Sequence, residues 1–271
     1  MVGNTKHEML RNSRRIPEGR NAMLTPILPE TIDACLFDLD GVLTRTATLH
    51  AAAWKAMFDT FLLERSEKAG ASFHPFDGAI DYARYVDGRL REDGVRAFLG
   101  SRGIALPEGA PVDPPTMSTV HGLGTRKNNL VLDLMQRHGI EVYDGSVHFV
   151  EAVRAAGLRC GVVSASKNCR EVLQSAGITR LFDVLIDGLT AEAQQLRGKP
   201  APDSFVAAAA ALNVEPSRCA VFEDAVAGVV AGRSGGFGWV VGVDRVGQSA
   251  ELRAHGADIV VGDLAELLEE Q

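Results

Sequence analysis

The sequence predicts an α/β fold, a doubly wound parallel sheet of the Rossmann-like type with an inserted block of helices. Three observations predict it. Short, near-continuous apolar runs recur after residue 145, as in strands buried on both faces of a parallel sheet. Helical segments separate these runs, which is typical of β–α–β units. The chain has 271 residues, 46% of them hydrophobic, and can bury a sizeable core.

The first strand is expected at residues 34–37, the apolar run ACLF. No β–α–β partner lies near it, so we expect it to join the later strands in one sheet. Residues 46–63 are rich in alanine and free of Gly and Pro, which predicts a helix. The stretch 64–144 contains no convincing strand and is broken by Gly and Pro, but its parts 78–101 and 116–138 favour helix.

After residue 145, helices and strands alternate. Helices are expected at 146–156, 168–176, 199–212 and 225–232, and strands at 158–166, 181–188, 218–224, 238–244 and 257–261. This order divides the chain into three parts. We expect a poorly ordered N-terminal extension over 1–30, an α/β core formed by 31–45 and 145–271, and a helical cap domain over 46–144.

Composition argues against several classes of protein. The formal net charge of −7 argues against nucleic-acid binding, whose signature is a basic patch. We expect no membrane span, because no apolar stretch is long enough, and no secretory signal pattern is visible. The four cysteines match neither a zinc-site spacing nor a disulfide framework, which favours a reduced, cytoplasmic location.

The candidate site follows from what stands at the end of each expected strand. Ligands of open α/β sheets bind outside the carboxyl ends of the strands. Those ends and the loops beyond them carry four carboxylates, one hydroxyl and one ammonium: Asp38 and Asp40, Ser164, Lys199, and Glu223 and Asp224.

Four converging carboxylates repel one another unless a cation joins them, and Mg²⁺ prefers oxygen ligands. We therefore expect Mg²⁺ to be held by Asp38, Asp40, Glu223 and Asp224. Ser164, Lys199 and the amides of the following helix would form an anion site beside it.

A metal, a phosphate site and a free carboxylate together favour phosphoryl transfer. Asp38 is the candidate nucleophile, which would form an aspartyl-phosphate. Asp40, two residues further along the same face, is the candidate general acid and base.

Four segments in this order, FDLDGVLT, VVSASKN, GKPAPDSF and FEDAVAG, resemble the motifs of the haloacid dehalogenase superfamily. The match covers about 33–46 and 145–265, and the helical block stands where that superfamily carries a cap. Within the superfamily, the chain looks most like the β-phosphoglucomutases. The segment DGV after the first strand and the loop SASKN are similar to theirs.

Further matches lie in the cap. Thr46, His50 and Trp54 recur every four residues, so they share a helix face, and they match T-x3-H-x3-W. DGRLRED resembles the substrate loop G-x-x-R-E-D, and TRKNN resembles R-K-N-D. The resemblance implies catalytic roles for Asp38, Asp40, Ser164, Lys199 and His50. It implies substrate binding by Thr46, Trp54, Gly88, Arg91, Lys127, Asn128, Ala165, Ser166, Lys167 and Asn168.

Two positions depart from the family pattern. Asp87 stands where the sugar mutases usually have lysine, which leaves the sugar open. Arg45 replaces an aspartate next to the expected hinge, and we expect little consequence from it. The cap is also longer than the compact pattern, around 64–78 and 103–120.

The resemblance implies an enzyme that interconverts β-D-glucose 1-phosphate and glucose 6-phosphate through a phospho-aspartate and a sugar bisphosphate. A sugar-phosphate phosphatase would use the same residues and would differ only in letting water reach the phosphoenzyme. A non-catalytic sugar-phosphate binding module should have lost Asp38 or Asp40, and both are present. The expected partner is a small phosphorylated sugar, with no nucleic acid and no membrane.

Overall fold

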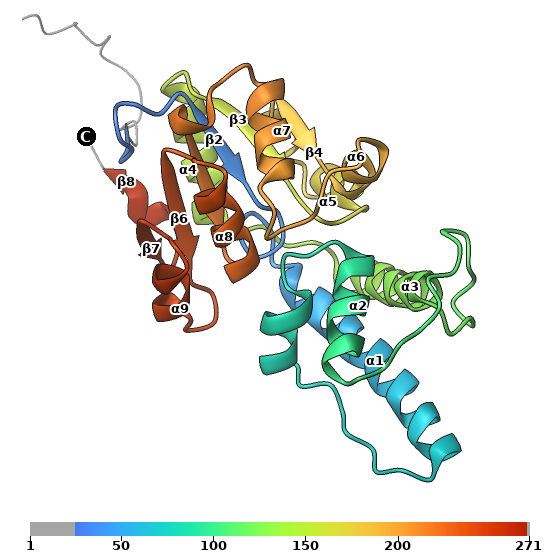
Figure 1. Ribbon diagram of the computed structural model, residues 1–271. Helices are drawn as coiled ribbons and strands as arrows, with labels where there is room; N and C mark the ends of the chain where they lie inside the picture. The colour runs from blue at the N-terminus through green and yellow to red at the C-terminus, as the bar shows by residue number, and fades with distance from the viewer. Residues whose placement is uncertain (1–24, 270–271) are drawn as a thin grey trace, which may run out of the picture.

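The centre of the molecule is a parallel sheet of six strands in the order β4-β3-β2-β5-β6-β7 (Figure 1). The structure, a computed structural model, describes residues 25–269. The strands are β2 (Ala34–Phe37), β3 (Arg159–Val163), β4 (Val184–Ile186), β5 (Cys219–Glu223), β6 (Trp239–Val243) and β7 (Ile259–Val261). Because β2 pairs with both β3 and β5, the expectation that the first strand joins the later ones is confirmed. The strand order reverses beside β2, where open sheets bind their ligands.

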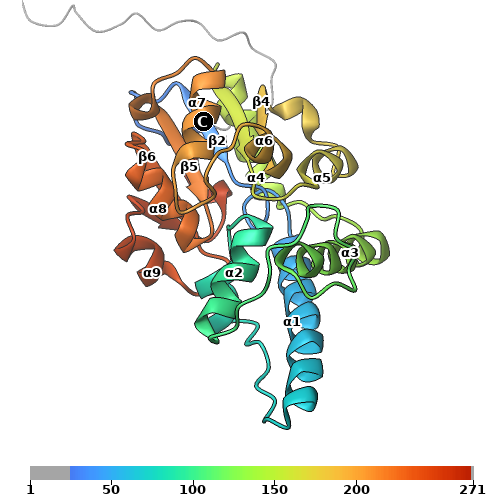
Figure 2. The same ribbon diagram turned by 45° about the vertical axis from the view of Figure 1, so that its right-hand side comes forward.

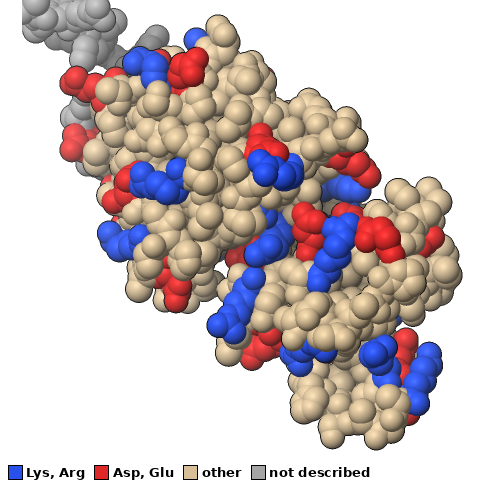
Figure 3. Space-filling view, viewed as in Figure 1, with Lys and Arg blue, Asp and Glu red and all other residues tan. Residues whose placement is uncertain are grey.

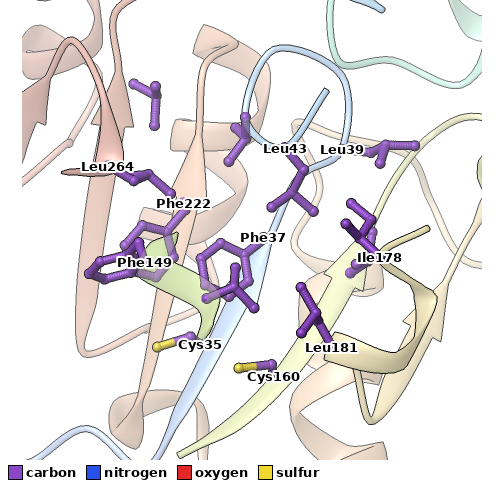
Figure 4. Packing of buried hydrophobic residues seen from close by; sticks show 14 of the residues in the cluster. Cys35, Phe37, Leu39, Leu43, Phe149, Cys160, Ile178, Leu181, Phe222 and Leu264 are labelled. Atoms are coloured by element: carbon purple, nitrogen blue, oxygen red, sulfur yellow. The ribbon is translucent and has the colours of Figure 1, made fainter. Parts of the chain in front are cut away.

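Helices cover both faces of the sheet, as a doubly wound fold requires. Alternate residues of β2 serve the two faces: Phe37 packs in one apolar cluster and Leu36 in another. On the first face Phe37 stacks on Phe222 with 4.6 Å between ring centroids, and both contact Phe149 (Figure 4). That face carries α4 (Asp144–Ala155) and α5 (Cys169–Ser175), and the second carries α7 (Asp203–Ala211), α8 (Val226–Ser234) and α9 (Ser249–Ala254).

A second body, here called the helical body, is inserted between β2 and β3. It consists of α1 (Ala47–Ala69), a π-helical turn η1 (Tyr82–Val86), α2 (Arg91–Ser101) and α3 (Val120–His138). Phe58, Phe76 and Phe98 pack in an apolar cluster of its own. Figures 1 and 2 show it against one end of the sheet, with α1 and α3 side by side.

The two chain segments that join the bodies are hydrogen-bonded to each other. Arg45 N–H donates to Glu141 O at 2.9 Å, and Tyr143 N–H donates to Leu43 O at 3.0 Å. A β-bridge between Thr44 and Val142 lies between these bonds. The connection is therefore a paired double strand.

In the core, the helix expected at 199–212 begins only at Asp203. In the helical body, the helices differ from expectation in three places. The helix expected at 46–63 continues to Ala69 and ends at Gly70, which is left-handed. The helix expected at 78–101 is interrupted at residues 87–90, because Gly88 adopts a φ of +68°. The helix expected at 116–138 begins only at Val120, since the Thr119 side chain accepts from Gly122 N–H and caps it.

Several short elements had no counterpart in the sequence analysis. They are α6 (Gly188–Ala193), α9, the 3-10 turns Thr179–Leu181, Pro216–Arg218 and Leu264–Leu267, and a strand pair of β1 (Thr25–Pro26) with β8 (Leu268–Glu269). Residues 1–24 of the expected extension lie outside the described residues, whereas Thr25–Pro26 pair with the end of the core. All four cysteines are buried free thiols. No helix within residues 25–269 is long and apolar enough to cross a membrane.

Candidate active site

A pocket lies where the helical body meets the carboxyl ends of the strands. It brings together most of the residues singled out from the sequence: Asp38, Asp40, His50, Trp54, Gly88, Arg91, Lys127, Asn128, Ala165, Ser166, Lys167, Asn168 and Asp224. The four that do not line it are Thr46, Ser164, Lys199 and Glu223, all buried. Figure 3 shows basic and acidic side chains side by side along the junction of the two bodies.

Lys199 binds two carboxylates beneath the pocket. Its Nζ donates to Asp38 Oδ1 at 2.5 Å, to Glu223 Oε1, and to Val163 O at 3.2 Å. Burial alone would lower the pKa of Lys199, but the two carboxylates outweigh burial and raise it. The two carboxylates therefore favour the charged ammonium form of Lys199 at the end of β2.

Gly41 lets Asp224 approach the end of β2. Its φ is +96°, a left-handed value that favours glycine, and its N–H donates to Thr44 O at 2.8 Å. A Cβ at this position would collide with the Asp224 carboxylate. The turn after Asp40 thus places its bare backbone against Asp224.

Asp40 is bound from the side of the helical body. Its Oδ1 accepts from Thr46 Oγ1 and lies 3.6 Å from His50 Nε2. On the other side of the imidazole, Lys127 Nζ lies 2.9 Å from His50 Nδ1 and 5.1 Å from the centre of the Trp54 ring. Burial lowers the pKa of Lys127 to about 7 and lowers that of His50 well below its usual value.

Four carboxyl groups line the pocket, those of Asp38, Asp40, Asp87 and Asp224. Burial, more than any other cause, raises the pKa of Asp38 to about 6 and that of Asp87 to about 7. It also raises the pKa of Asp40, and that of Asp224 well above the usual value, to which neighbouring carboxylates add. A cation placed among these groups would favour their charged forms.

The donor set fits a magnesium ion that takes few protein ligands. Within residues 25–269, no three His, Cys, Asp or Glu side chains come together as a metal site. Glu223 is fully buried, with its oxygens on Lys199 Nζ and Ala225 N–H, and it does not line the pocket. Asp38, Asp40 and Asp224, the other three carboxylates of the expected set, line the pocket. Oδ1 of Asp40 already accepts from Thr46 Oγ1, so we expect Asp38 and Asp224 to hold the ion. Two carboxylates suit Mg²⁺, which commonly keeps waters and binds substrate phosphate.

Residues 165–168, in the loop that follows β3, form another wall of the pocket. Ser164 Oγ accepts from Ser166 N–H at 3.1 Å, and Ser166 Oγ accepts from Asn168 N–H at 3.2 Å. Asn168 Nδ2 donates to Asn128 Oδ1 of α3 at 3.0 Å, which joins the two bodies over the pocket. A Cβ on Gly88 would lie 3.0 Å from the Ala225 Cβ, so the bodies also touch there.

Some pocket residues escaped the sequence analysis. Tyr82, Val86 and Arg89 line the pocket, and Asp87 was noted only as a departure. Arg89 stands within DGRLRED and could have been found there. Tyr82 and Val86 belong to the π-helical turn, which no local sequence pattern predicts.

Comparisons with known proteins identify the family of the chain. A family model described as haloacid dehalogenase-like hydrolase matches residues 32–236. A β-phosphoglucomutase of Mycobacterium tuberculosis (strain CDC 1551 / Oshkosh) is 56% identical over 93% of this chain and 97% of that protein. One of Bacillus subtilis (strain 168) is 31% identical over 86% and 91%. The solved structure of a β-phosphoglucomutase from Clostridium difficile aligns with a TM-score of 0.67 at 28% identity, over 87% of this chain and 93% of that one.

The family match spans most of the chain, and both relatives align over nearly their whole length. The chain therefore belongs to the haloacid dehalogenase-like hydrolase family, on the branch that holds the β-phosphoglucomutases. The resemblance seen in the sequence and the expected α/β fold class are confirmed. The protein is an enzyme of phosphoryl transfer, a phosphomutase or a phosphatase.

Proposed function

We propose that the protein is a Mg²⁺-dependent mutase that interconverts β-D-glucose 1-phosphate and glucose 6-phosphate through an aspartyl-phosphate and a sugar bisphosphate. Two relatives bear the name of this activity. The observation that carries the proposal is that cations line the pocket from both bodies: Lys167 from the core, and Arg91 and Lys127 from the helical body. A mutase must hold a bisphosphate by both ends, whereas a phosphatase needs to hold only one phosphate.

The two ends would be held differently. The core end is a cradle of backbone amides, hydroxyls and ammonium groups from residues 164–168 and Lys199. The distal end is the guanidinium of Arg91, which can bind a phosphate with two parallel hydrogen bonds. Within residues 25–269 the Arg91 guanidinium has a single hydrogen bond, a long one of 3.5 Å from Nη1 to Gly124 O.

Asp38 supplies the nucleophilic carboxylate. One of its oxygens bonds to phosphorus while the bond between phosphorus and the sugar oxygen breaks. Lys199, held at 2.5 Å, keeps Asp38 oriented and offsets its charge. Asp38 and Asp224 would hold Mg²⁺, which supplies further charge neutralisation at the phosphate when bound.

Asp40 moves the proton. It gives a proton to the departing sugar oxygen, and takes one from the sugar hydroxyl that later receives the phosphoryl group. Burial raises the pKa of Asp40, which favours a protonated carboxyl before transfer. Thr46, donating to Oδ1, orients it.

Exclusion of water would separate the mutase from a phosphatase. The contacts of Asn168 with Asn128 and of Gly88 with Ala225 hold the helical body over the pocket. A closed pocket protects the phosphoenzyme from hydrolysis until a sugar hydroxyl is in place.

A phosphatase is the second candidate. Asp87 lines the pocket at the position where the sugar mutases usually have a lysine. Its carboxyl group cannot bind a phosphate as a lysine ammonium would. A validoxylamine A 7'-phosphate phosphatase of Streptomyces hygroscopicus subsp. limoneus is 29% identical over 86% of this chain.

Phosphorus NMR of β-glucose 1-phosphate with the protein and Mg²⁺ distinguishes the two. We expect the signal of glucose 6-phosphate to grow, and excess EDTA to stop it. Growth of free phosphate without the isomer would favour the phosphatase. Full activity in EDTA would contradict the assignment of Asp38 and Asp224 as metal ligands.

A further inference from the structure

The loop that follows β6, residues 244–249 and here called the clamp loop, contacts the active site from a side that no motif covers. It is held rigid by Asp244. Oδ1 of Asp244 accepts from Gly247 N–H at 2.7 Å and Gln248 N–H at 2.8 Å, and Oδ2 accepts from Ser249 N–H at 3.0 Å. Two side chains of this fixed turn reach the catalytic loops.

Arg245 binds the turn after Asp40. Its Nε donates to Gly41 O at 2.9 Å, and its Nη1 donates to Gly262 O at 2.6 Å and Asp263 Oδ2 at 2.9 Å. The guanidinium lies 3.6 Å from the centre of the Tyr143 ring, in the connection between the two bodies. Only 13% of the Arg245 side chain is exposed. Its orientation is therefore fixed on several sides.

Gln248 binds the other catalytic loop. Its Nε2 donates to Asp224 O at 2.7 Å. Gly41 and Asp224 lie so close together that a Cβ on Gly41 would strike the Asp224 carboxylate, which lines the pocket. The clamp loop therefore donates hydrogen bonds to the backbone carbonyls of both Gly41 and Asp224.

We propose that the clamp loop sets the spacing between the turn of Asp38 and Asp40 and the carboxylate of Asp224, with Arg245 and Gln248 as positioning residues. The inference rests on the proposed function, because that function requires Asp38 and Asp224 to share a metal ion. Neither side chain lines the pocket, so each would act through the backbone that it holds.

Conservative variants test the clamp. Arg245→Lys keeps the charge but loses the planar fork of donors. Gln248→Met keeps the length and removes the donor. Arg233→Lys is the matched control, since Arg233 also donates to a backbone carbonyl, that of Gly256, at 3.0 and 2.7 Å, away from the pocket.

Binding of Mg²⁺ to the full chain, measured by calorimetry without substrate, gives a readout that needs no turnover. We expect Arg245→Lys and Gln248→Met each to lower the Mg²⁺ affinity by about tenfold. This is the lower end of the loss that is typical when a residue that orients a metal ligand is replaced. We expect kcat to fall by about as much with KM little changed, while the melting temperature stays close to that of Arg233→Lys.

Unchanged Mg²⁺ affinity in both variants would overturn the proposal. So would losses that merely follow the unfolded fraction seen by circular dichroism. Failure of the proposed function would give a different result, the absence of isomerase activity in the unaltered chain. The Mg²⁺ affinities of the two variants would still test the role of the clamp loop in that case.

Discussion

Lys199 Nζ lies 2.5 Å from Asp38 Oδ1, and both side chains are buried together with Glu223. The lysine supplies a buried cation to two buried carboxylates. Removing one partner of a buried ion pair leaves uncompensated charge, which costs about 3–5 kcal/mol. Lys199→Met should therefore lower the free energy of unfolding by an amount in this range at about pH 8, measured by urea denaturation.

The same variant should recover stability in acid. Burial raises the pKa of Asp38 to about 6 and of Glu223 to about 7 even with the lysine present. A carboxyl group whose pKa is higher in the folded state than in the unfolded state lowers the stability of the fold as the pH rises from the unfolded pKa to the folded pKa. The deficit of Lys199→Met should thus shrink at about pH 5. Lys55→Met, which breaks an exposed pair with Asp59, should change stability by less than about 1 kcal/mol. A deficit independent of pH would contradict this account of Lys199.

Gly41→Ala should weaken Mg²⁺ binding. The new Cβ would displace the Asp224 carboxylate, and we expect affinity to fall by about tenfold in calorimetry. Gly70→Ala is the control, because Gly70 also has a positive φ, +61°, but open space around it. Both variants should lose about 1 kcal/mol of stability from backbone strain. Equal Mg²⁺ affinity in the two would mean that the contact between Gly41 and Asp224 has no part in metal binding.

Asp40→Asn should bind sugar phosphate as the parent does but turn it over slowly. The amide cannot exchange a proton with the sugar oxygen, and general acid–base help is worth roughly 10²–10⁴-fold. Steady-state kcat measures the loss, and isothermal calorimetry of glucose 6-phosphate measures binding. Near-normal kcat would exclude Asp40 as the acid and base.

Arg91→Ala should separate isomerisation from simple hydrolysis. Each charge-assisted hydrogen bond to the distal phosphate is worth about 1.5–3 kcal/mol, so isomerisation should fall by at least about tenfold. Hydrolysis of acetyl phosphate, which has no distal phosphate, should barely change. Equal loss of both activities would indicate a structural role for Arg91, and loss of neither would favour the phosphatase.

The carboxylates at the strand ends could be predicted from the sequence because local pattern fixes them. An apolar run followed by Asp38 and Asp40 places both side chains on one rim, and the order of the later strands places Asp224 beside them. The sequence does not reveal that Lys199 binds Glu223, which lies beneath the pocket and does not line it.

Other parts of the site depend on contacts between distant residues. Arg245 donates to Gly41, 204 residues earlier in the chain, and no local pattern announces such a bond. The break at residues 87–90 depends on the left-handed backbone of Gly88, which packs against Ala225. Arg45 was expected to matter little, but its guanidinium lies 4.4 Å from the centre of the Tyr143 ring, in the connection between the bodies.

The most direct test of the mechanism is to identify the residue that carries the phosphoryl group. The protein is mixed with the sugar bisphosphate and Mg²⁺, quenched in acid within the first turnovers, digested and analysed by mass spectrometry. We expect one phosphorylated peptide, labile to hydroxylamine as an acyl-phosphate is, with the added mass on Asp38, and no such peptide from a folded Asp38→Asn variant. A phosphoryl group on another residue, or full isomerase activity in Asp38→Asn, would contradict transfer through Asp38.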